Sequence, residues 1–252
     1  MDKQNKTVLL TGTINSTLYN NTGNKLKNVS ERYYMYTESI EAYIKESVFD
    51  NIVFAENSQY DFPVDRFFEM AKEYNKKFEY VKCPSYIEET IRHGKSYGEA
   101  RMIEDALKMS SLLQENSTIY KITGRIFLKN SKDICKSLKK HRNEYIVYMS
   151  KKWCFTNIFK FNREDYISYW NNVWKKCDEK SGNDIERVFF KILDENRNLD
   201  VGCFSVYPYF KGIQGATLKP YSGKIAERMV RSALCKLGAF TYGTMTSKML
   251  KL

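Results

Sequence analysis

Residues 94–130, GKSYGEARMIEDALKMSSLLQENSTIYKITGRIFLKN, decide the expected fold. The first six of them predict a polar loop, because glycine at 94 and 98 permits positive φ and a close backbone approach. From Glu99 onward, apolar and small residues recur at helical spacing, and acidic residues lie in the early turns, where the helix dipole favours them. The segment therefore predicts a loop at the N-terminus of an amphipathic helix.

A strand is predicted next, over residues 118–128, because this run is rich in β-branched and aromatic side chains. The two-residue period of a strand places Lys121, Thr123 and Arg125 on one face. Gly124, between two cations, indicates a bulge or a close approach by a ligand or a neighbouring backbone. The alternative interpretation is an edge strand with a solvated basic face.

Composition limits the class of protein. The 252 residues suffice for one large α/β domain or two small ones, and neither a membrane span nor an apolar signal-peptide core is apparent, which predicts a cytoplasmic location. Six cysteines without a C-x-x-C pair and only two histidines argue against a zinc site, a disulfide framework and a His-based catalytic triad. The net charge of +11 predicts an anionic partner.

Strand and helix patterns alternate in the first half of the chain. Strands are predicted over 7–14, 49–55 and 78–81, and helices over 31–47 and 64–75. This alternation predicts parallel βαβ units, in which ligands lie at the carboxyl ends of the strands.

Polar residues follow the first two predicted strands. Thr11, Gly12, Thr13 and Asn15 follow the first, and Glu56 and Asn57 follow the second. We expect the first group to lie where a nucleotide binds, and the second either to bind its base or ribose or to hold the turn between strand and loop.

The second half of the chain predicts a less regular order. We expect a basic helix over 133–140, strands over 144–149, 153–161 and 201–207, helices over 163–176, 185–193 and 224–237, and a loop over 208–215. No repeat or linker is evident, so we predict a single domain over 1–252. It comprises a donor half over 7–130, an acceptor half over 131–238 and a basic tail over 239–252.

Six motifs in this order, TGTIN, IVFAENS, GKSYGE, YKITGRIFLKN, NDIERVFF and PYFKGIQG, span most of residues 7–215. Together they resemble a group of bacterial glycosyltransferases that build capsule, lipopolysaccharide and other surface polysaccharides. The resemblance implies an α/β fold consisting of a single Rossmann-like, GT-A-type domain with a mixed central sheet. It also implies a nucleotide-sugar donor as substrate and a glycan or lipid-linked acceptor.

One departure from that group concerns the metal. Many enzymes of the implied fold hold Mg²⁺ or Mn²⁺ through an Asp-x-Asp at the end of a central strand, whereas residues 121–125 here read KITGR. We therefore expect no metal ligands. Lys121 and Arg125 are expected to neutralise charge on the departing phosphate, beside Thr123 and Gly124 in the donor site.

The acceptor hydroxyl needs a general base if the reaction inverts the sugar configuration. The resemblance places Glu186 on the acceptor side, with Asp184 close enough to substitute. The alternative interpretation of Glu186 is an acid that caps its own helix.

The glycine-bounded segment supplies further candidates for donor binding. Lys95 could attract phosphate, Tyr97 could stack on the donor beside Gly98, and Glu99 could hold a sugar hydroxyl. The alternatives are plain surface residues for Lys95 and Tyr97, and a helix cap for Glu99.

The sequence has features of two other classes of function. A nicotinamide-dependent enzyme is disfavoured, because the glycines of G-x-G-x-x-G after Gly12 are missing and Glu56 lies too far along the chain. A nucleic-acid-binding protein fits the charge but lacks any motif of such folds, so we expect no nucleic-acid partner. Excess lysine and the C-terminal helix and tail predict docking on the anionic inner face of a membrane, with packing of residues 225–252 on the core as the alternative.

Overall fold

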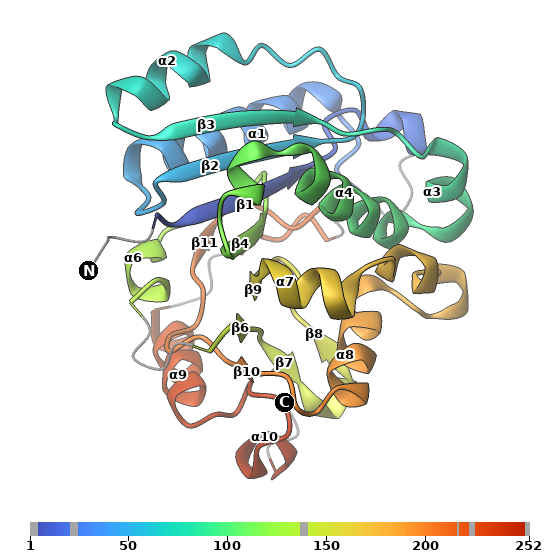
Figure 1. Cartoon of the computed structure of the whole chain (residues 1–252), viewed down its shortest axis with the longest axis vertical. Coiled ribbons are helices and arrows are strands. Elements are labelled where there is room, and N and C mark those ends of the chain that lie inside the picture. Colours follow the sequence, from blue (N-terminus) through green and yellow to red (C-terminus); the bar gives the residue numbers. More distant parts are fainter. Residues whose placement is uncertain (1–4, 21–24, 137–140, 216, 222–224, 250–252) are drawn as a thin grey trace.

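A computed structural model of the chain describes residues 5–20, 25–136, 141–215, 217–221 and 225–249. A seven-stranded sheet forms its centre, in the order β10-β6-β9-β4-β1-β2-β3 (Figure 1). Its strands are β1 (Thr7–Gly12), β2 (Asn51–Glu56), β3 (Lys77–Lys82), β4 (Thr118–Thr123), β6 (Asn143–Glu144), β9 (Ile158–Asn162) and β10 (Val201–Gly202). Only β9 runs antiparallel to its neighbours, β4 and β6. The predicted α/β class with a mixed central sheet is confirmed.

Helices cover both faces of this sheet. The α-helices of the described residues are α1 (Val29–Glu46), α2 (Asp65–Glu73), α3 (Ile87–His93), α4 (Lys95–Met109), α5 (Ser111–Gln114), α6 (Ser131–Ile134), α7 (Arg163–Asp165), α8 (Ile185–Glu195), α9 (Ile225–Lys236) and α10 (Met245–Met249). Alternate residues of β1 enter two cores: Leu9 packs with α4 and α8, and Val8 and Leu10 pack with α1 and α2. A strand buried on both faces needs the continuous apolar run that β1 has.

Short elements complete the chain. Two small antiparallel pairs join β5 (Phe127–Leu128) to β11 (Phe210–Lys211) and β7 (Val147–Tyr148) to β8 (Trp153–Cys154). Single turns of 3-10 helix occur at Ser16–Tyr19, Met149–Lys151, Val173–Lys176 and Glu179–Ser181, and a π-helical turn at Tyr166–Trp170. No helix within the described ranges is both long and apolar enough to cross a membrane.

The predicted loop over residues 94–99 is wrong. Helix α4 already begins at Lys95, and only Gly94 separates it from α3. Gly94 has φ of +101°, a backbone conformation that L side chains rarely adopt. A single glycine therefore makes the whole connection, and Gly98 lies inside the helix.

The predicted strand over 118–128 is shorter than expected. Strand β4 ends at Thr123, and the chain turns at Gly124 and Arg125 before β5. The Gly124 N–H donates to the Thr11 carbonyl at 2.8 Å, and a Cβ at Gly124 would lie 2.9 Å from that same oxygen. The close approach that the glycine predicted is thus made by a neighbouring backbone.

The second half departs further from expectation. The strands predicted over 144–149, 153–161 and 201–207 shrink to the short segments β6 to β10, and the predicted helix over 163–176 becomes α7, a π-helical turn and a 3-10 turn. Residues 137–140 of the predicted basic helix, residue 224 and residues 250–252 of the predicted tail lie outside the described residues. The helices expected over 185–193 and 224–237 are present as α8 and α9.

Candidate active site

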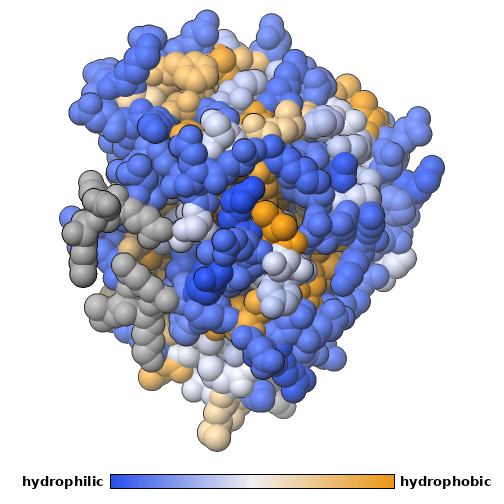
Figure 2. All heavy atoms as spheres, viewed as in Figure 1, coloured by the Kyte–Doolittle hydropathy of each residue, from blue (hydrophilic) through white to orange (hydrophobic). Residues whose placement is uncertain are grey.

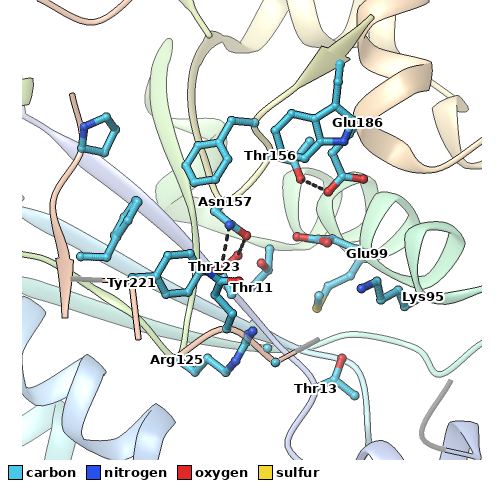
Figure 3. A pocket seen from close by; sticks show the side chains of 18 of the residues that line it. Thr11, Thr13, Lys95, Glu99, Thr123, Arg125, Thr156, Asn157, Glu186 and Tyr221 are labelled. Carbon is cyan, nitrogen blue, oxygen red and sulfur yellow. Dashed lines mark hydrogen bonds between the residues drawn. The ribbon is translucent and has the colours of Figure 1, made fainter. Parts of the chain in front are cut away.

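A cavity of about 1000 Å³ opens at the carboxyl ends of β1 and β4. It brings together many of the predicted residues from both halves of the chain. These are Thr11, Gly12, Thr13, Asn57, Lys95, Gly98, Glu99, Thr123, Arg125 and Glu186. The predicted donor and acceptor residues therefore share one hollow, part of which is seen in Figure 3.

Two carboxylates point toward each other across this hollow, Glu99 from α4 and Glu186 from α8 (Figure 3). Behind Glu99, the fully buried ammonium of Lys121 pairs with its carboxylate and also donates to the Thr156 carbonyl at 2.9 Å. Burial alone would raise the pKa of Glu99, but the charge and hydrogen bond of Lys121 bring its pKa below the ordinary value. Glu99 is therefore a stable anion in the wall of the cavity.

Glu186 has the opposite shift. Burial, followed by the negative charge of Glu99, raises its pKa to about 7. Its Oε1 accepts a hydrogen bond of 2.9 Å from the Thr156 hydroxyl. A carboxylate with this pKa exchanges a proton near neutral pH, which suits general acid or base chemistry.

Asp184 and Glu186 have separate tasks in α8. Asp184 is the N-cap: its Oδ1 accepts from the Arg187 N–H at 2.8 Å, and its Oδ2 pairs with the Arg187 guanidinium. Asp184 does not line the cavity, whereas Glu186 does. Asp184 provides the N-cap, but the Glu186 carboxylate also interacts with its own backbone N–H in the first turn of α8, so its place in the cavity does not remove the capping interpretation.

Lys121 is the predicted residue whose position differs most from expectation. It lies in β4 with its side chain wholly buried, and it does not line the cavity. The strand is central and covered on both faces, so the face that appeared basic in the sequence is turned toward α4. The prediction of direct contact between Lys121 and a departing phosphate does not fit this position.

Arg125, unlike Lys121, lies in the wall of the cavity. It lies just beyond β4, lines the cavity, and is seen opposite Glu99 and Glu186 in Figure 3. Its buried Nε has no hydrogen-bond partner, and no carboxylate lies within ion-pair distance of it in the described part of the chain. A guanidinium with unused donors in a cavity is suited to bind a phosphate through paired hydrogen bonds.

Two more predicted residues, Glu56 and Asn15, support the cavity from outside. The Glu56 carboxylate accepts from the N–H groups of Ile14 at 3.0 Å and Ser58 at 2.9 Å, so it holds the strand–loop turn rather than a ribose. Burial raises the pKa of Glu56 despite these donors. Asn15 caps the turn Ser16–Tyr19 by accepting from the Thr17 N–H.

Tyr97 also lies away from the cavity. Its ring stacks on His93 with centroids 5.5 Å apart and meets Trp174 edge-on at 5.6 Å. Because α4 begins at Lys95, Tyr97 is already inside the helix and packs in the core. The prediction that it stacks on a donor is wrong.

Several cavity residues were missed in the sequence. Arg32, buried in α1, donates to the carbonyl groups of Thr13 and Ile14 and fixes the loop after β1. The sequence signal that could have identified Arg32 is its spacing: it lies four positions before Tyr36, on the same buried face of the helix. Asn157 accepts from the Thr123 hydroxyl at 3.2 Å and donates to the Tyr221 hydroxyl at 2.8 Å, joining distant segments that no local pattern links.

The donor set of the cavity does not resemble a site for a hard divalent cation. Among the residues that the structure describes, no group of three or more His, Cys, Asp or Glu side chains is arranged to hold a metal. The carboxylate of Glu99 is already paired with Lys121, and β4 ends in Thr123, Gly124 and Arg125.

Comparisons with known proteins give no match to any family model and none to a curated protein. Solved structures show weak similarity. The glycosyltransferase GlyE of Streptococcus pneumoniae TIGR4 gives a TM-score of 0.47 at 10% identity, covering 80% of this chain and 45% of that chain. An active-site mutant of LgtC gives 0.45 at 8% identity, covering 78% and 71%. The 4-diphosphocytidyl-2C-methyl-D-erythritol synthase of Anaerococcus prevotii gives 0.46 at 11% identity, covering 92% and 96%. Values of this size carry no functional argument.

Proposed function

We propose that this protein is a glycosyltransferase that moves a sugar from a nucleotide-sugar donor to a hydroxyl of a glycan or lipid-linked acceptor in bacterial surface-polysaccharide synthesis. The observation that carries this proposal is the pair of facing carboxylates with opposite pKa shifts, Glu99 lowered and Glu186 raised to about 7. Environments that push the pKa values of two neighbouring acids apart are typical of sites where the two have different catalytic roles.

In this proposal Glu186 is the general base of an inverting transfer. Its carboxylate takes the proton from the acceptor hydroxyl as the new bond forms between that oxygen and the anomeric carbon of the donor sugar. The bond from this carbon to the phosphate oxygen breaks, and its electron pair leaves with the nucleoside diphosphate. Glu99, held ionised by Lys121, holds a donor-sugar hydroxyl and keeps the pKa of Glu186 high.

Arg125 supports the leaving group. It lies at the carboxyl end of β4, where its cavity-facing guanidinium can bind the diphosphate, and Lys95 adds a second positive charge on the cavity wall. We propose that these side chains make the reaction independent of divalent metal. We also propose that the nucleoside lies against Thr11, Gly12, Thr13 and Asn57.

Replacing Arg125 by Gln should weaken the binding of a nucleoside diphosphate by about 10- to 100-fold, because charge-assisted hydrogen bonds to phosphate are lost. Thermal-shift titrations with UDP, GDP, CDP and their nucleosides, each with Mn²⁺ and with chelator, measure this effect. The nucleosides should bind the variant as they bind the wild type. Arg66, exposed and paired with Glu41 on the far helices, provides the control R66Q.

Activity distinguishes the proposal from nucleotide transfer. Incubation with nucleotide sugars and candidate acceptors should release nucleoside diphosphate, equally with chelator and with Mn²⁺. If the protein instead released pyrophosphate when incubated with a nucleoside triphosphate and a sugar phosphate, it would be a nucleotidyltransferase and the proposed glycosyl transfer would be wrong. Strict Mn²⁺ dependence would contradict the role given to Arg125.

We further propose that α9 and α10 dock on an anionic membrane, on the cytoplasmic face where a lipid-linked acceptor resides. Ile225, Met229 and Val230 of α9 and Leu237 just after it form an exposed apolar stripe, and Figure 2 shows hydrophobic residues at the lower end of the molecule, where α9 and α10 lie. Exposed Lys236 and Lys248 and the net charge of +11 favour an anionic surface over a second, equally basic copy of the chain.

The double variant M229E/V230E should reduce co-sedimentation with phosphatidylglycerol vesicles at least about tenfold, since two exposed apolar side chains that would enter the membrane surface become charged. The wild type should bind neutral phosphatidylcholine vesicles much more weakly. Ile167, an exposed apolar residue on another element, provides the control I167E. Unchanged binding by M229E/V230E, or a stable dimer in vesicle-free sedimentation that this variant abolishes, would overturn the docking proposal.

A further inference from the structure

The second half of the chain forms one wall of the cavity, and this wall is rich in cationic and aromatic side chains. Helix α9 and the turn after β7 contribute Lys151, Arg228 and Arg231, here termed the basic wall. Aromatic side chains stand beside these cations and also line the cavity: Tyr148, Trp153, Phe155, Tyr207 and Tyr209. None of these positions was predicted as a site residue from the sequence.

Each cation of the basic wall lies over a tyrosine ring. The Arg228 guanidinium carbon is 3.8 Å from the centroid of Tyr209, and that of Arg231 is 4.9 Å from the centroid of Tyr207. Lys151 Nζ lies 5.2 Å from the centroid of the Tyr148 ring. The rings hold the charged groups in defined positions without neutralising them.

Most of the positive charge on this wall is uncompensated. Glu227 is the acid that lines this part of the cavity, and it pairs with Arg231 at 2.6 Å. Neither Arg228 nor Lys151 has a carboxylate within 4.0 Å in the described ranges, and the buried Nε of Arg228 has no hydrogen-bond partner. A buried guanidinium donor without an acceptor indicates a ligand that supplies one.

The donor half cannot account for this second group of cations. Arg125, just beyond β4, and Lys95, at the start of α4, already provide positive charge for a nucleoside diphosphate, and they belong to other elements. Aromatic faces bind sugar rings, and the cations beside them bind anions. The arrangement suits a ligand that combines a sugar with a negative charge.

We propose that the basic wall binds an anionic group, a phosphate or a carboxylate, on the acceptor saccharide, so that the acceptor is a charged glycan or a sugar linked through phosphate to a lipid. The inference rests on the proposed function and specifies the acceptor class. Arg228 donates its Nε–H and Nη–H groups to the anion, Lys151 adds charge, and the sugar ring lies on the tyrosine and tryptophan faces.

The test uses calorimetric titration of protein saturated with the nucleoside diphosphate that gives the largest thermal shift, so that the donor site is filled. Glucose 1-phosphate, glucuronic acid and methyl glucoside are the probes. At least one anionic sugar should bind about tenfold or more tightly than methyl glucoside, as expected for a charge-assisted hydrogen bond. Preference for the phosphate or for the carboxylate identifies the anion.

Variants separate this binding from structural stacking. R228Q and K151Q should each remove most of the preference for the anionic sugar, while R228K keeps more of it than R228Q. Lys175, whose Nζ lies 5.1 Å from the Trp174 ring outside the cavity, provides the matched control K175Q, which should leave binding unchanged. Melting curves of each variant identify any loss of folding, and R228K then serves in place of R228Q.

The outcomes separate this inference from the proposed function. Equal binding of charged and neutral sugars, or an anion preference that survives in both R228Q and K151Q, would overturn the anionic acceptor while leaving the donor site intact. Failure of every nucleoside diphosphate to bind would instead overturn the proposed function.

Discussion

The variant E186Q is expected to lower kcat by about 100- to 10,000-fold, the range that a general base contributes. Glutamine keeps the shape of the side chain and can still accept from the Thr156 hydroxyl, which is 2.9 Å from Glu186 Oε1. It cannot take a proton from the acceptor. Donor binding should therefore change little, and initial rates with a saturating donor measure the loss.

The pH profile tests the same role independently. The wild-type kcat/KM should rise with pH and reach half its maximum near pH 7, because the raised pKa of Glu186 keeps it protonated at lower pH. The residual activity of E186Q should lack this limb. Glu195, an exposed acid at the other end of α8, provides the control E195Q, which should keep both the rate and the profile.

A stability measurement on the same variant shows the cost of the raised pKa. The folded pKa of Glu186 is about 7, above the ordinary glutamate value of 4.5 that applies in the unfolded chain, so the folded state binds more protons between these values. Stability from this group is present below about pH 4.5 and is lost as pH rises to about 7. Glutamine does not ionise, so E186Q does not lose this stability as the pH rises. The free energy of unfolding of E186Q, relative to that of the wild type, should therefore increase from pH 4 to pH 8 by at most about 3 kcal/mol.

An E186Q enzyme with wild-type turnover would remove Glu186 from the mechanism. A large activity loss accompanied by a loss of stability at pH 8 would point to structural damage instead. The expected combination is a less active and more stable protein, which a purely structural residue would not give.

The first half of the fold could be predicted because its pattern is local. Strands β1 and β2 are mostly apolar runs and β3 alternates in burial, each is followed by a helix, and polar residues after β1 and β2 mark one edge of the sheet. Parallel pairing then brings Thr11, Asn57 and Thr123 together without further information.

Alternation within β4 predicts the wrong environment for Lys121, for a physical reason. Lys121 shares a strand face with Ile119 and Thr123, and a lysine on such a face suggests solvent. In a sheet covered on both sides there is no solvent face, and Ile119 packs in the core beneath α4. The partner that makes the buried lysine tolerable is Glu99, 22 residues away, which no period in the strand reveals.

The second half was less predictable because its strands are short and its contacts distant. The aromatic run over 153–161 is split where Thr156 and Asn157 leave the strand pattern to line the cavity. Helix α9 was recognised from its apolar periodicity, but periodicity does not tell which face is buried. In the structure much of the apolar stripe is exposed and Arg228 faces inward.

Replacing Lys121 by Met is expected to lower the free energy of unfolding by about 2–4 kcal/mol. The change leaves Glu99 without its cation and the Thr156 carbonyl without a donor, in a place that water does not fully reach. The side chain of Glu99 is 28% exposed, so the loss is smaller than for a fully buried pair. Denaturant unfolding at pH 7 measures it, and exposed Lys82 on β3 provides the control K82M.

The double variant K121M/E99Q tests whether the ion pair is the cause. If Lys121 stabilises the fold mainly by compensating the charge of Glu99, neutralising Glu99 should recover a large part of the loss. Additive losses would assign the effect to the packing of the lysine stem against Phe159, whose ring centroid lies 5.7 Å from Nζ.

The ion pair between Lys121 and Glu99 also affects the pKa of the proposed general base, Glu186. Without Lys121, the pKa of Glu99 should rise, because burial then acts unopposed, and Glu99 loses its negative charge over part of the working pH range. That charge is the second cause of the raised pKa of Glu186, after burial. The rising limb of activity in E99Q should therefore move to lower pH than in the wild type, whereas K82M should keep it near pH 7. An unmoved limb would mean that burial alone sets the pKa of Glu186, and that Lys121 and Glu99 act only through structure.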